Sequence, residues 1–335
     1  GASLKAIYDF GGITLTSITA YENAHGYSRG DTDGGAAADF GGTAPNYCAA
    51  GCGQSRGVLR GLDQWSQELR LASPDSGRFK WQIGGIYFDS RDMTEFDQRA
   101  YFLTSNALGT TPNPNNWVLL HNVNTSWGLF GQASYEILPD FTLTAGARIT
   151  EDTKLTRLVK TADTAAGVVT YRGRTNVRLS DTKPSWDVSA LYEASPDLSL
   201  YARVARGFRG PTIQGRSAVF NSPFTTADSE TIMSYEAGFK SQPTSNLRFN
   251  ATAFAYTVKN IQLNGNDTNG SGVLFNANHA NAYGIEAEAE WRPIRNITFT
   301  LGGSALHSKI KDPNAYAQVC SLNGVMVCTV LNPIA

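Results

Sequence analysis

Apolar and polar residues alternate with a period of two along almost the whole chain. From Phe141 to Thr150 every odd position is apolar, whereas the even positions hold Thr, Gly or Arg. From Ile285 to Arg292 the contrast is sharper, because Ile, Ala, Ala and Trp alternate with Glu, Glu, Glu and Arg. Successive side chains of a β-strand point to opposite faces, so this pattern predicts strands with one apolar and one polar face. Helical spacing fits none of these segments.

Short and long connections alternate between the predicted strands. The short ones are rich in Pro, Asp, Asn and Gly and lie at residues 9–12, 73–77, 138–140, 195–197, 242–246 and 292–296. The long ones run roughly over residues 25–61, 92–117, 156–177, 208–229, 262–280 and from 310 onward. We count about twelve strands in six hairpins, several of them longer than a typical soluble strand of about 5–6 residues. This asymmetry predicts an all-β, antiparallel transmembrane β-barrel, with short turns in the periplasm and long loops outside the cell.

Aromatic residues gather near the short turns. The members are Tyr8 and Phe10, Phe79 and Trp81, Tyr135 and Phe141, Tyr192, Phe239 and Phe249, and Trp291 and Phe299. The core of a β-sandwich would place aromatic rings in the middle of strands, where this sequence has mostly Ala, Gly, Leu, Ile and Val. A girdle at a membrane interface explains the clustering better.

Composition agrees with a barrel and argues against nucleic-acid binding. Lys and Arg total 28 against 29 Asp and Glu, so the net charge is −1 and supplies no attraction for phosphate backbones. No apolar run approaches the roughly 18 residues that a membrane-spanning helix needs. The first residues, Gly1 to Lys5, lack the features of a signal peptide.

The direction of the chain predicts a partial barrel. The first strand runs toward the turn at residues 9–12, and the last, about 297–309, runs away from a turn. Single-chain bacterial barrels have even strand numbers and keep both ends in the periplasm. We therefore expect residues 1–335 to be part of a barrel domain, with strands lacking at each end. Unpaired barrel edges would expose backbone to lipid, so we expect this piece to be unstable alone.

Several phrases resemble those of TonB-dependent receptors. They are Gln67-Glu68-Leu69-Arg70-Leu71-Ala72-Ser73, Gly131-Gln132-Ala133-Ser134-Tyr135, residues 141–148, residues 201–212 with the phrase Gly207-Phe208-Arg209-Gly210-Pro211-Thr212, residues 234–240 and residues 282–288. Their order and spacing cover residues 66–292. The resemblance implies a 22-stranded barrel, an N-terminal plug that this chain lacks, and transport driven through that plug by the TonB complex of the inner membrane.

The four cysteines form two close pairs, Cys48 with Cys52 and Cys320 with Cys328. Two readings compete, local disulfides in an oxidising compartment or a metal site. The histidines are scattered along the sequence, which disfavours zinc. We favour two disulfides in the loops and expect no metal.

Basic and aromatic residues of the predicted loops are candidates for ligand contact. Arg203, Arg206, Arg209 and Arg216 lie near the end of one strand and in its loop, and Arg suits bidentate capture of carboxylate or phosphate. They could equally pair with lipopolysaccharide phosphates or with lumen carboxylates such as Glu236. An apolar platform for a chelate could come from Tyr27, Tyr47, Trp117, Phe220 and Phe224, and simple loop packing explains these rings equally well.

Catalysis and cofactor binding find no support. Motifs for metallopeptidases, hydrolases and nucleotide-binding enzymes are lacking. The carboxylates of Glu286, Glu288 and Glu290 should line a hydrated lumen or contact a plug. Residues 264–270 lack the acidic spacing of a calcium loop.

The leading hypothesis is a bacterial outer-membrane importer that captures a scarce nutrient and releases it when TonB acts. By resemblance the default cargo is a ferric siderophore, with cobalamin, haem and oligosaccharide left open. A passive porin is the main alternative, and a secreted β-rich binding module is a third. Outer-membrane lipids and lipopolysaccharide are the other expected partners.

Overall fold

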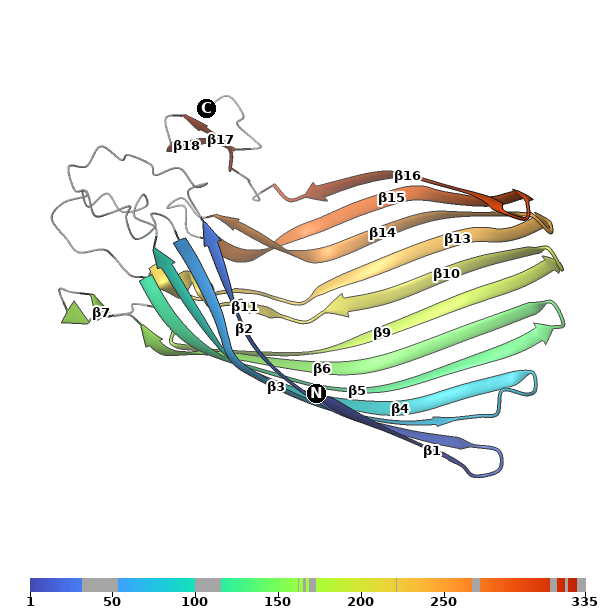
Figure 1. Ribbon diagram of the computed structural model, residues 1–335, viewed down its shortest axis with the longest axis horizontal. Helices are drawn as coiled ribbons and strands as arrows, with labels where there is room; N and C mark the ends of the chain where they lie inside the picture. The colour runs from blue at the N-terminus through green and yellow to red at the C-terminus, as the bar shows by residue number, and fades with distance from the viewer. Residues whose placement is uncertain are drawn as a thin grey trace.

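The computed structural model describes residues 1–31, 54–99, 116–161, 163–164, 167–168, 173–220, 222–266, 272–313, 318–322 and 325–329. Twelve long strands form one sheet (Figure 1): β1 (Ala2–Asp9), β2 (Thr14–Asp31), β3 (Gln54–Ala72), β4 (Phe79–Arg99), β5 (Asn116–Leu138), β6 (Phe141–Thr161), β9 (Asn176–Ser195), β10 (Leu198–Arg209), β13 (Glu230–Thr244), β14 (Leu247–Asn266), β15 (Gly272–Ile294) and β16 (Ile297–Lys311). Each strand pairs antiparallel with its neighbours along the chain. The predicted meander of about twelve strands is confirmed.

Smaller elements occupy the connections at one end of the sheet. They are the hairpins β7 (Asp163–Thr164) with β8 (Gly167–Val168), β11 (Thr212–Gln214) with β12 (Thr225–Ala227) and β17 (Gln318–Leu322) with β18 (Val325–Thr329), and the 3₁₀ helix η2 (Arg216–Phe220). None of them is predicted by the alternation. Within the described ranges, no helix is long and apolar enough to cross a membrane.

The long strands continue well into the segments that the sequence assigns to long loops. Strand β2 runs to Asp31 and β3 begins at Gln54, although residues 25–61 were expected to form a loop. Strands β5 and β15 each run for 23 residues, about twice the 9–11 residues that a tilted membrane crossing needs. Beyond the apolar band both faces of a strand are polar, so the period-two contrast fades although the hydrogen-bonded ladder continues. The predicted loop boundaries are therefore wrong for these strands.

The short turns all lie at one end of the sheet, which we call the short-turn rim, and the strand ends that lead into the long connections lie at the other, the long-loop rim (Figure 1). The first turn shows how sequence fixes this rim. Gly11 has a φ of 84°, which side-chain-bearing residues rarely adopt. Its N–H donates to the Asp9 carboxylate at 2.8 Å, the local bond that makes Asp a turn residue.

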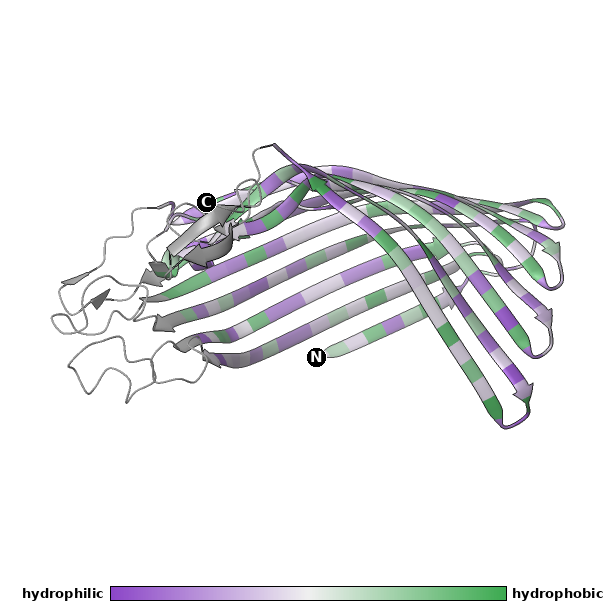
Figure 2. Cartoon of the chain, turned by 90° about the horizontal axis from the view of Figure 1, so that it is seen from above, coloured by the Kyte–Doolittle hydropathy of each residue, from purple (hydrophilic) through white to green (hydrophobic). Residues whose placement is uncertain are grey.

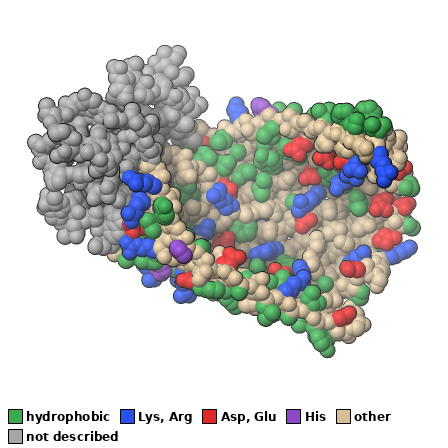
Figure 3. All heavy atoms as spheres, viewed as in Figure 1, with side chains coloured by type: hydrophobic (Ala, Val, Ile, Leu, Met, Phe, Trp, Pro, Cys, Tyr) green, Lys and Arg blue, Asp and Glu red, His purple; other side chains and the backbone are tan. Residues whose placement is uncertain are grey.

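The two faces of the sheet differ in chemistry, as the alternating colours along the strands show in Figure 2. Side chains such as Leu69, Ile83, Leu129, Ile285 and Leu301 are exposed on one face, the outer face. The opposite, inner face is hollowed and carries many charged side chains (Figure 3). An apolar outer surface of this extent requires a nonaqueous surrounding, as expected for a transmembrane barrel wall.

The outer face carries a second row of aromatic residues in addition to the one predicted beside the short turns. Its members are Tyr21, Trp65, Tyr87, Trp127, Trp186, Tyr235 and Tyr283, which we call the upper belt. Register pairs Tyr21 with Trp65 and Tyr87 with Trp127, and it joins Tyr235 to Tyr283 through Ala255. Tyr283 and Trp291 lie eight positions apart on β15. Eight residues span about 27 Å along a strand, or about 20 Å across a layer at a tilt of roughly 40–45°. The two rows thus bracket an apolar band of membrane dimensions.

Candidate functional site

Residues 210–220 and 222–228, which we call the inserted segment, leave the end of β10 and pack onto the inner face. The segment holds β11, η2 and β12, and it contacts β4, β5, β6 and β9 on one side and β15 on the other. It therefore crosses the hollow of the sheet near the long-loop rim instead of projecting away from it.

The underside of the inserted segment completes a small apolar core. Ala218, Val219 and Phe224 pack with Val118, Leu120 and Val177 of the wall, and all six are buried. Their side chains are the only buried apolar cluster of this kind found among the described residues, which is expected where a wall otherwise faces solvent or lipid. Burial of these side chains contributes free energy that holds the middle of the segment against the wall.

Gln262 of β14 binds both ends of the inserted segment. Its amide nitrogen donates to the carbonyl oxygens of Gly210 at 2.8 Å and Asp228 at 3.0 Å. Its amide oxygen accepts from the hydroxyl of Thr212 at 2.8 Å. The backbone N–H of Gln262 donates to Glu230 at 2.6 Å. Only 8% of Gln262 is exposed, so these bonds are shielded from competing water.

A second group of hydrogen bonds fixes the middle of the inserted segment. The amide oxygen of Gln214 accepts from the hydroxyls of Ser217 and Thr225, each at 2.9 Å. Thr225 in turn accepts from the backbone N–H of Leu274. The side-chain amide oxygen of Asn276 on β15 accepts from the backbone N–H of Asp228 at 2.7 Å, and its amide nitrogen donates to the Asp228 carbonyl oxygen at 2.9 Å. The fold of the segment is therefore specified by side chains of β14 and β15 as much as by its own.

Basic side chains lie along the upper surface of this arrangement. Arg216 is exposed, and its guanidinium carbon lies 5.4 Å from the centre of the Phe96 ring. Arg209 lies 3.7 Å from the Glu230 carboxylate, with 62% of its side chain exposed. Burial lowers the pKa of Lys154, Asp152 opposes this shift, and the charge of Arg209 adds to it. Lys154 lies beyond the upper belt on β6, so this electrostatic effect acts at the long-loop rim.

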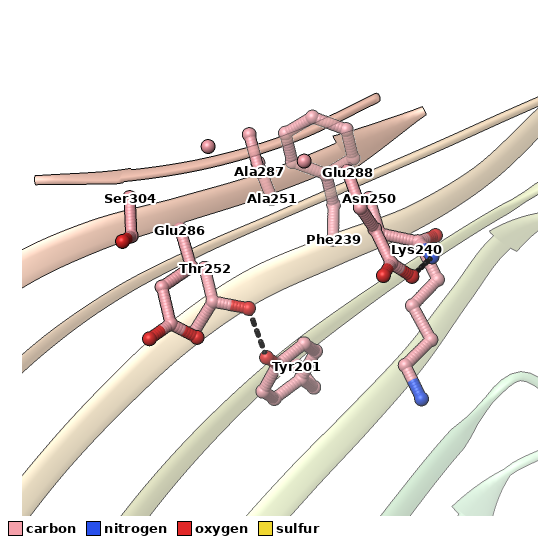
Figure 4. Close-up of a pocket in the computed structure, with 12 residues that line it drawn as sticks. Tyr201, Phe239, Lys240, Asn250, Ala251, Thr252, Glu286, Ala287, Glu288 and Ser304 are labelled. Carbon is pink, nitrogen blue, oxygen red and sulfur yellow. Dashed lines mark hydrogen bonds between the residues drawn. The ribbon is translucent and has the colours of Figure 1, made fainter. Parts of the chain in front are cut away.

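Deeper in the hollow, the inner wall of β10 and β13–β16 forms a polar concavity of about 550 Å³ (Figure 4). Glu286 and Glu288 project into it, and Asn250 donates to Glu288 at 2.8 Å. The hydroxyl of Tyr201 lies 2.7 Å from that of Thr252 (Figure 4). The Tyr201 ring covers Gly238, where a Cβ would lie 2.9 Å from the ring. Register places Glu286, Glu288 and Glu290 on the inner face, as the alternation predicts.

A second concavity of about 410 Å³ lies beside the first, on the wall formed by β4, β5, β6, β9, β10 and β13. Arg148, Asp187 and Arg203 are among the residues that line it, and Arg203 lies 3.6 Å from Asp187. Gln82 donates to Gln132 at 3.0 Å on the same wall. This wall thus carries positive and negative side chains, some of which pair with one another. Such a surface suits contact with water or with the polar groups of another protein element.

The structure separates the four candidate arginines. Arg203 lies on the inner wall beside Asp187, and Arg209 and Arg216 lie at the inserted segment. Arg206 pairs in register with Trp186 and faces outward at the upper belt. Arg209 and Arg216 thus share one region, whereas Arg206 is on the opposite face of the sheet.

The aromatic candidates also divide. Phe224 is buried in the apolar core, and Tyr27 is 83% exposed on β2. Trp117 and Phe220 have described backbones, but their side chains lie outside the described residues, as does all of Tyr47.

Of the cysteines, Cys48 and Cys52 lie outside the described residues, and Cys320 and Cys328 are register partners in the β17–β18 hairpin. Across the described part of the chain, no group of three or more His, Cys, Asp or Glu residues could hold a metal ion.

The sequence pattern gives no indication of Gln262, Gln214 or Asn276 as site residues. Each is a polar residue in a stretch where the alternation has faded, and its partners are distant in sequence. A signal was available for the upper belt, since its aromatics share the outward register of the apolar band.

Comparison with protein-family models matches residues 1–318 to the family described as "TonB dependent receptor-like, beta-barrel". Among curated proteins, the pesticin receptors of Yersinia enterocolitica and Yersinia pestis are each 28% identical over 132 residues. That alignment covers 39% of this chain and 19% of the relatives, so the chain spans only a minor part of their length.

Solved structures share the fold. The ferric yersiniabactin uptake receptor FyuA from Yersinia pestis superposes with a TM-score of 0.66 at 17% identity, over 92% of this chain and 42% of that one. The siderophore receptor PiuA from Acinetobacter baumannii gives 0.66 at 14% identity, over 99% and 49%. The copper transporter OprC gives 0.66 at 14% identity, over 92% and 47%.

Proposed function

Because this chain belongs to the TonB-dependent receptor family, as part of its outer-membrane β-barrel, we propose that it forms the wall of an importer that takes up a ferric siderophore. The family consists of transporter receptors and not enzymes. In this proposal, TonB energises transport through a plug that fills the hollow described above. The long-loop rim faces the cell exterior and the short-turn rim faces the periplasm.

In this proposal the ligand binds at the inserted segment. The segment turns the end of β10 into a ledge across the hollow, so a solute arriving from the long-loop side meets Arg216 and Arg209 before the deeper wall. Ferric chelates of carboxylate, catecholate or hydroxamate type present oxygen-rich surfaces, often with net negative charge. Guanidinium groups bind such oxygens through charge-assisted hydrogen bonds.

The polar inner wall supports an active importer over an open pore. Glu286, Glu288 and the Arg203–Asp187 pair face the hollow of the sheet. A plug held by polar contacts can rearrange without exposing a large apolar surface to water, which suits a gate that must move. A ferric yersiniabactin uptake receptor and a siderophore receptor among the structural neighbours support iron chelates as the first cargo to test.

The test uses the natural receptor expressed from its complete gene in a bacterium that lacks its own ferric-chelate receptors. Uptake of radioactive iron is measured from catecholate, hydroxamate and phenolate chelates, with and without a functional TonB gene. We expect saturable uptake of at least one chelate that disappears without TonB. Uptake of haem, cobalamin or oligosaccharide instead would reassign the cargo, and TonB-independent uptake with high conductance in planar bilayers would establish a passive channel.

Arg216→Gln tests the place of binding. Loss of one charge-assisted contact costs about 1.5–3 kcal/mol, so the half-saturating chelate concentration should rise roughly tenfold or more. Arg91→Gln is the matched control, because Arg91 is exposed on β4 and lies 3.0 Å from Asp89, away from the inserted segment. Equal, small effects of the two variants would exclude Arg216 from the ligand site.

A further inference from the structure

The outer face of β2 and β3 carries three polar side chains within the apolar band. Thr19 lies one same-face position from Tyr21 of the upper belt, toward the short-turn rim, and Ser17 lies two such positions from it. Gln67 is the register partner of Thr19. One same-face step is about 6.8 Å along a strand, or about 5 Å across the membrane at a tilt of roughly 40–45°. These three side chains, which we call the polar triad, therefore lie about 5–10 Å inside the band.

The polar triad interrupts an otherwise apolar surface. In the described strands of the long sheet from β4 to β16, the outer-face positions between the two aromatic rows hold Ala, Val, Leu, Ile and Gly. Apolar residues also flank the triad, because Leu4 pairs with Thr19 and Leu69 pairs with Ser17. Lipid tails offer no hydrogen-bond partner, so a polar side chain at this depth is costly unless another protein group meets it.

Hydrogen bonds join the members of the triad to one another. The Thr19 hydroxyl donates to the amide oxygen of Gln67 at 2.5 Å. The amide nitrogen of Gln67 donates to the Ser17 hydroxyl at 3.0 Å and to the Glu68 carbonyl oxygen at 3.1 Å. These bonds use the hydroxyl hydrogen of Thr19 and both hydrogens of the Gln67 amide. The triad is thus a preformed group whose side chains hold one another in place.

The triad keeps one donor and several acceptors for a partner. The Ser17 hydroxyl accepts from Gln67, and its own hydrogen has no acceptor among the described residues. The Thr19 hydroxyl oxygen and the Gln67 amide oxygen each retain a lone pair that can accept. The set is therefore self-complementary, because the spare donor of one triad matches a spare acceptor of an identical triad. A two-fold axis would form both contacts at once, since it brings the same patch of two copies together.

We propose that the polar triad is the centre of an interface between two copies of this receptor within the membrane. The Ser17 hydroxyl of each copy donates to the amide oxygen of Gln67 of the partner subunit, so two reciprocal hydrogen bonds form across the axis. Such bonds between hydroxyl and amide side chains join membrane segments because no water competes for them. Ala6 is the register partner of Ser17, and this small side chain leaves the hydroxyl accessible. Leu4 and Leu69, both exposed, pack around the bonds.

The test measures self-association of the full-length receptor in liposomes of phosphatidylethanolamine and phosphatidylglycerol. Copies labelled with a donor or an acceptor dye in a short turn are mixed, and energy transfer is followed as the protein-to-lipid ratio changes. Gln67→Leu removes the amide and leaves an apolar side chain that lipid tolerates. Gln82→Leu is the matched control, because it is the same substitution on the inner face of β4, where Gln82 donates to Gln132 at 3.0 Å.

We expect the unmodified receptor to form dimers, and Gln67→Leu to raise the dissociation constant roughly tenfold or more, because both reciprocal bonds are lost. Gln82→Leu should change this constant by less than about threefold. Ser17→Ala removes only the spare donor and should weaken association in the same direction as Gln67→Leu. A receptor that stays monomeric at every ratio would overturn the proposal. Equal effects of the Gln67 and Gln82 variants, or unchanged association of Ser17→Ala, would do the same.

Photo-crosslinking in intact outer membranes locates the contact. A photoreactive amino acid replaces Leu69 beside the triad, or Leu143 at an outer-face position of β6 as the matched control. We expect the Leu69 position to crosslink to a second copy of the receptor and the Leu143 position to give little of this product. Crosslinking from Leu143 and not from Leu69 would place the interface elsewhere and overturn the proposal. A product that joins Leu69 to a different protein in place of a second copy would assign the triad to another partner and would also overturn it.

Discussion

Replacing Gln262 should release the inserted segment from the barrel wall while the wall itself stays folded. The side chain makes three hydrogen bonds, to Gly210, Asp228 and Thr212, and Leu in its place would keep the volume but remove all three. A buried hydrogen bond contributes a net of about 0.5–1.5 kcal/mol, so the loss amounts to about 3 kcal/mol. The β14–β15 ladder uses backbone groups and is unaffected.

Hydrogen exchange of the segment's backbone amides measures this release, because exchange there requires local opening. A change of about 3 kcal/mol corresponds to roughly a hundredfold faster exchange in residues 212–227, with strands β5 and β13 unchanged. Gln262→Glu should act in the same direction, since it removes the two donors and places a carboxylate beside Glu230. Asn264→Ala, at an exposed position two residues along β14, is the control.

Exchange that rises by less than about threefold in Gln262→Leu would refute the reasoning. It would mean that the apolar core of the segment, and not the Gln262 bonds, holds its ends. Faster exchange in the segment and in β13 together would also contradict it, because the bonds would then support the wall as a whole.

Three further outcomes are expected. Gly238→Val should lower the stability of the barrel by about 1–3 kcal/mol in thermal unfolding, because an added Cβ would lie 2.5 Å from the Ala251 carbonyl oxygen and 2.9 Å from the Tyr201 ring; an unchanged midpoint would contradict the close packing of these groups. Leu120→Ala should cost about 2–4 kcal/mol and loosen the inserted segment, since Leu120 is buried beneath it, and exchange of the segment is the measurement. Cys320 and Cys328 should react with iodoacetamide only after reduction, because their backbones are register partners; labelling without reductant would exclude that disulfide.

The barrel wall was predictable because its signal is local. Where one face meets lipid and the other water, residues such as Leu143 and Thr144 must alternate, and a window of a few residues is enough to recognise the strand. The same logic explains the errors. Beyond the upper belt no lipid enforces alternation, so the continuation of β2 to Asp31 and of β15 past His279 left no pattern.

The candidate site was harder to predict because its interactions are long-range. Gln262 and Gly210 are 52 positions apart, and nothing near either residue indicates that they meet. The proposal of an arginine cluster rested on nearness in sequence, which in a strand places neighbours on opposite faces. Arg206 and Arg209 differ by three positions, so the strand turns them to opposite sides.

The two faces of β13–β16 impose separate demands on alternate residues of the same strands. A carboxylate at an even position of β15, such as Glu286, meets the hollow, whereas a ring at an odd position, such as Tyr283, lies on the outer face. In the proposed importer, changing the inner set should alter contact with the plug and leave the apolar outer face intact, because neighbouring residues of a strand point to opposite faces.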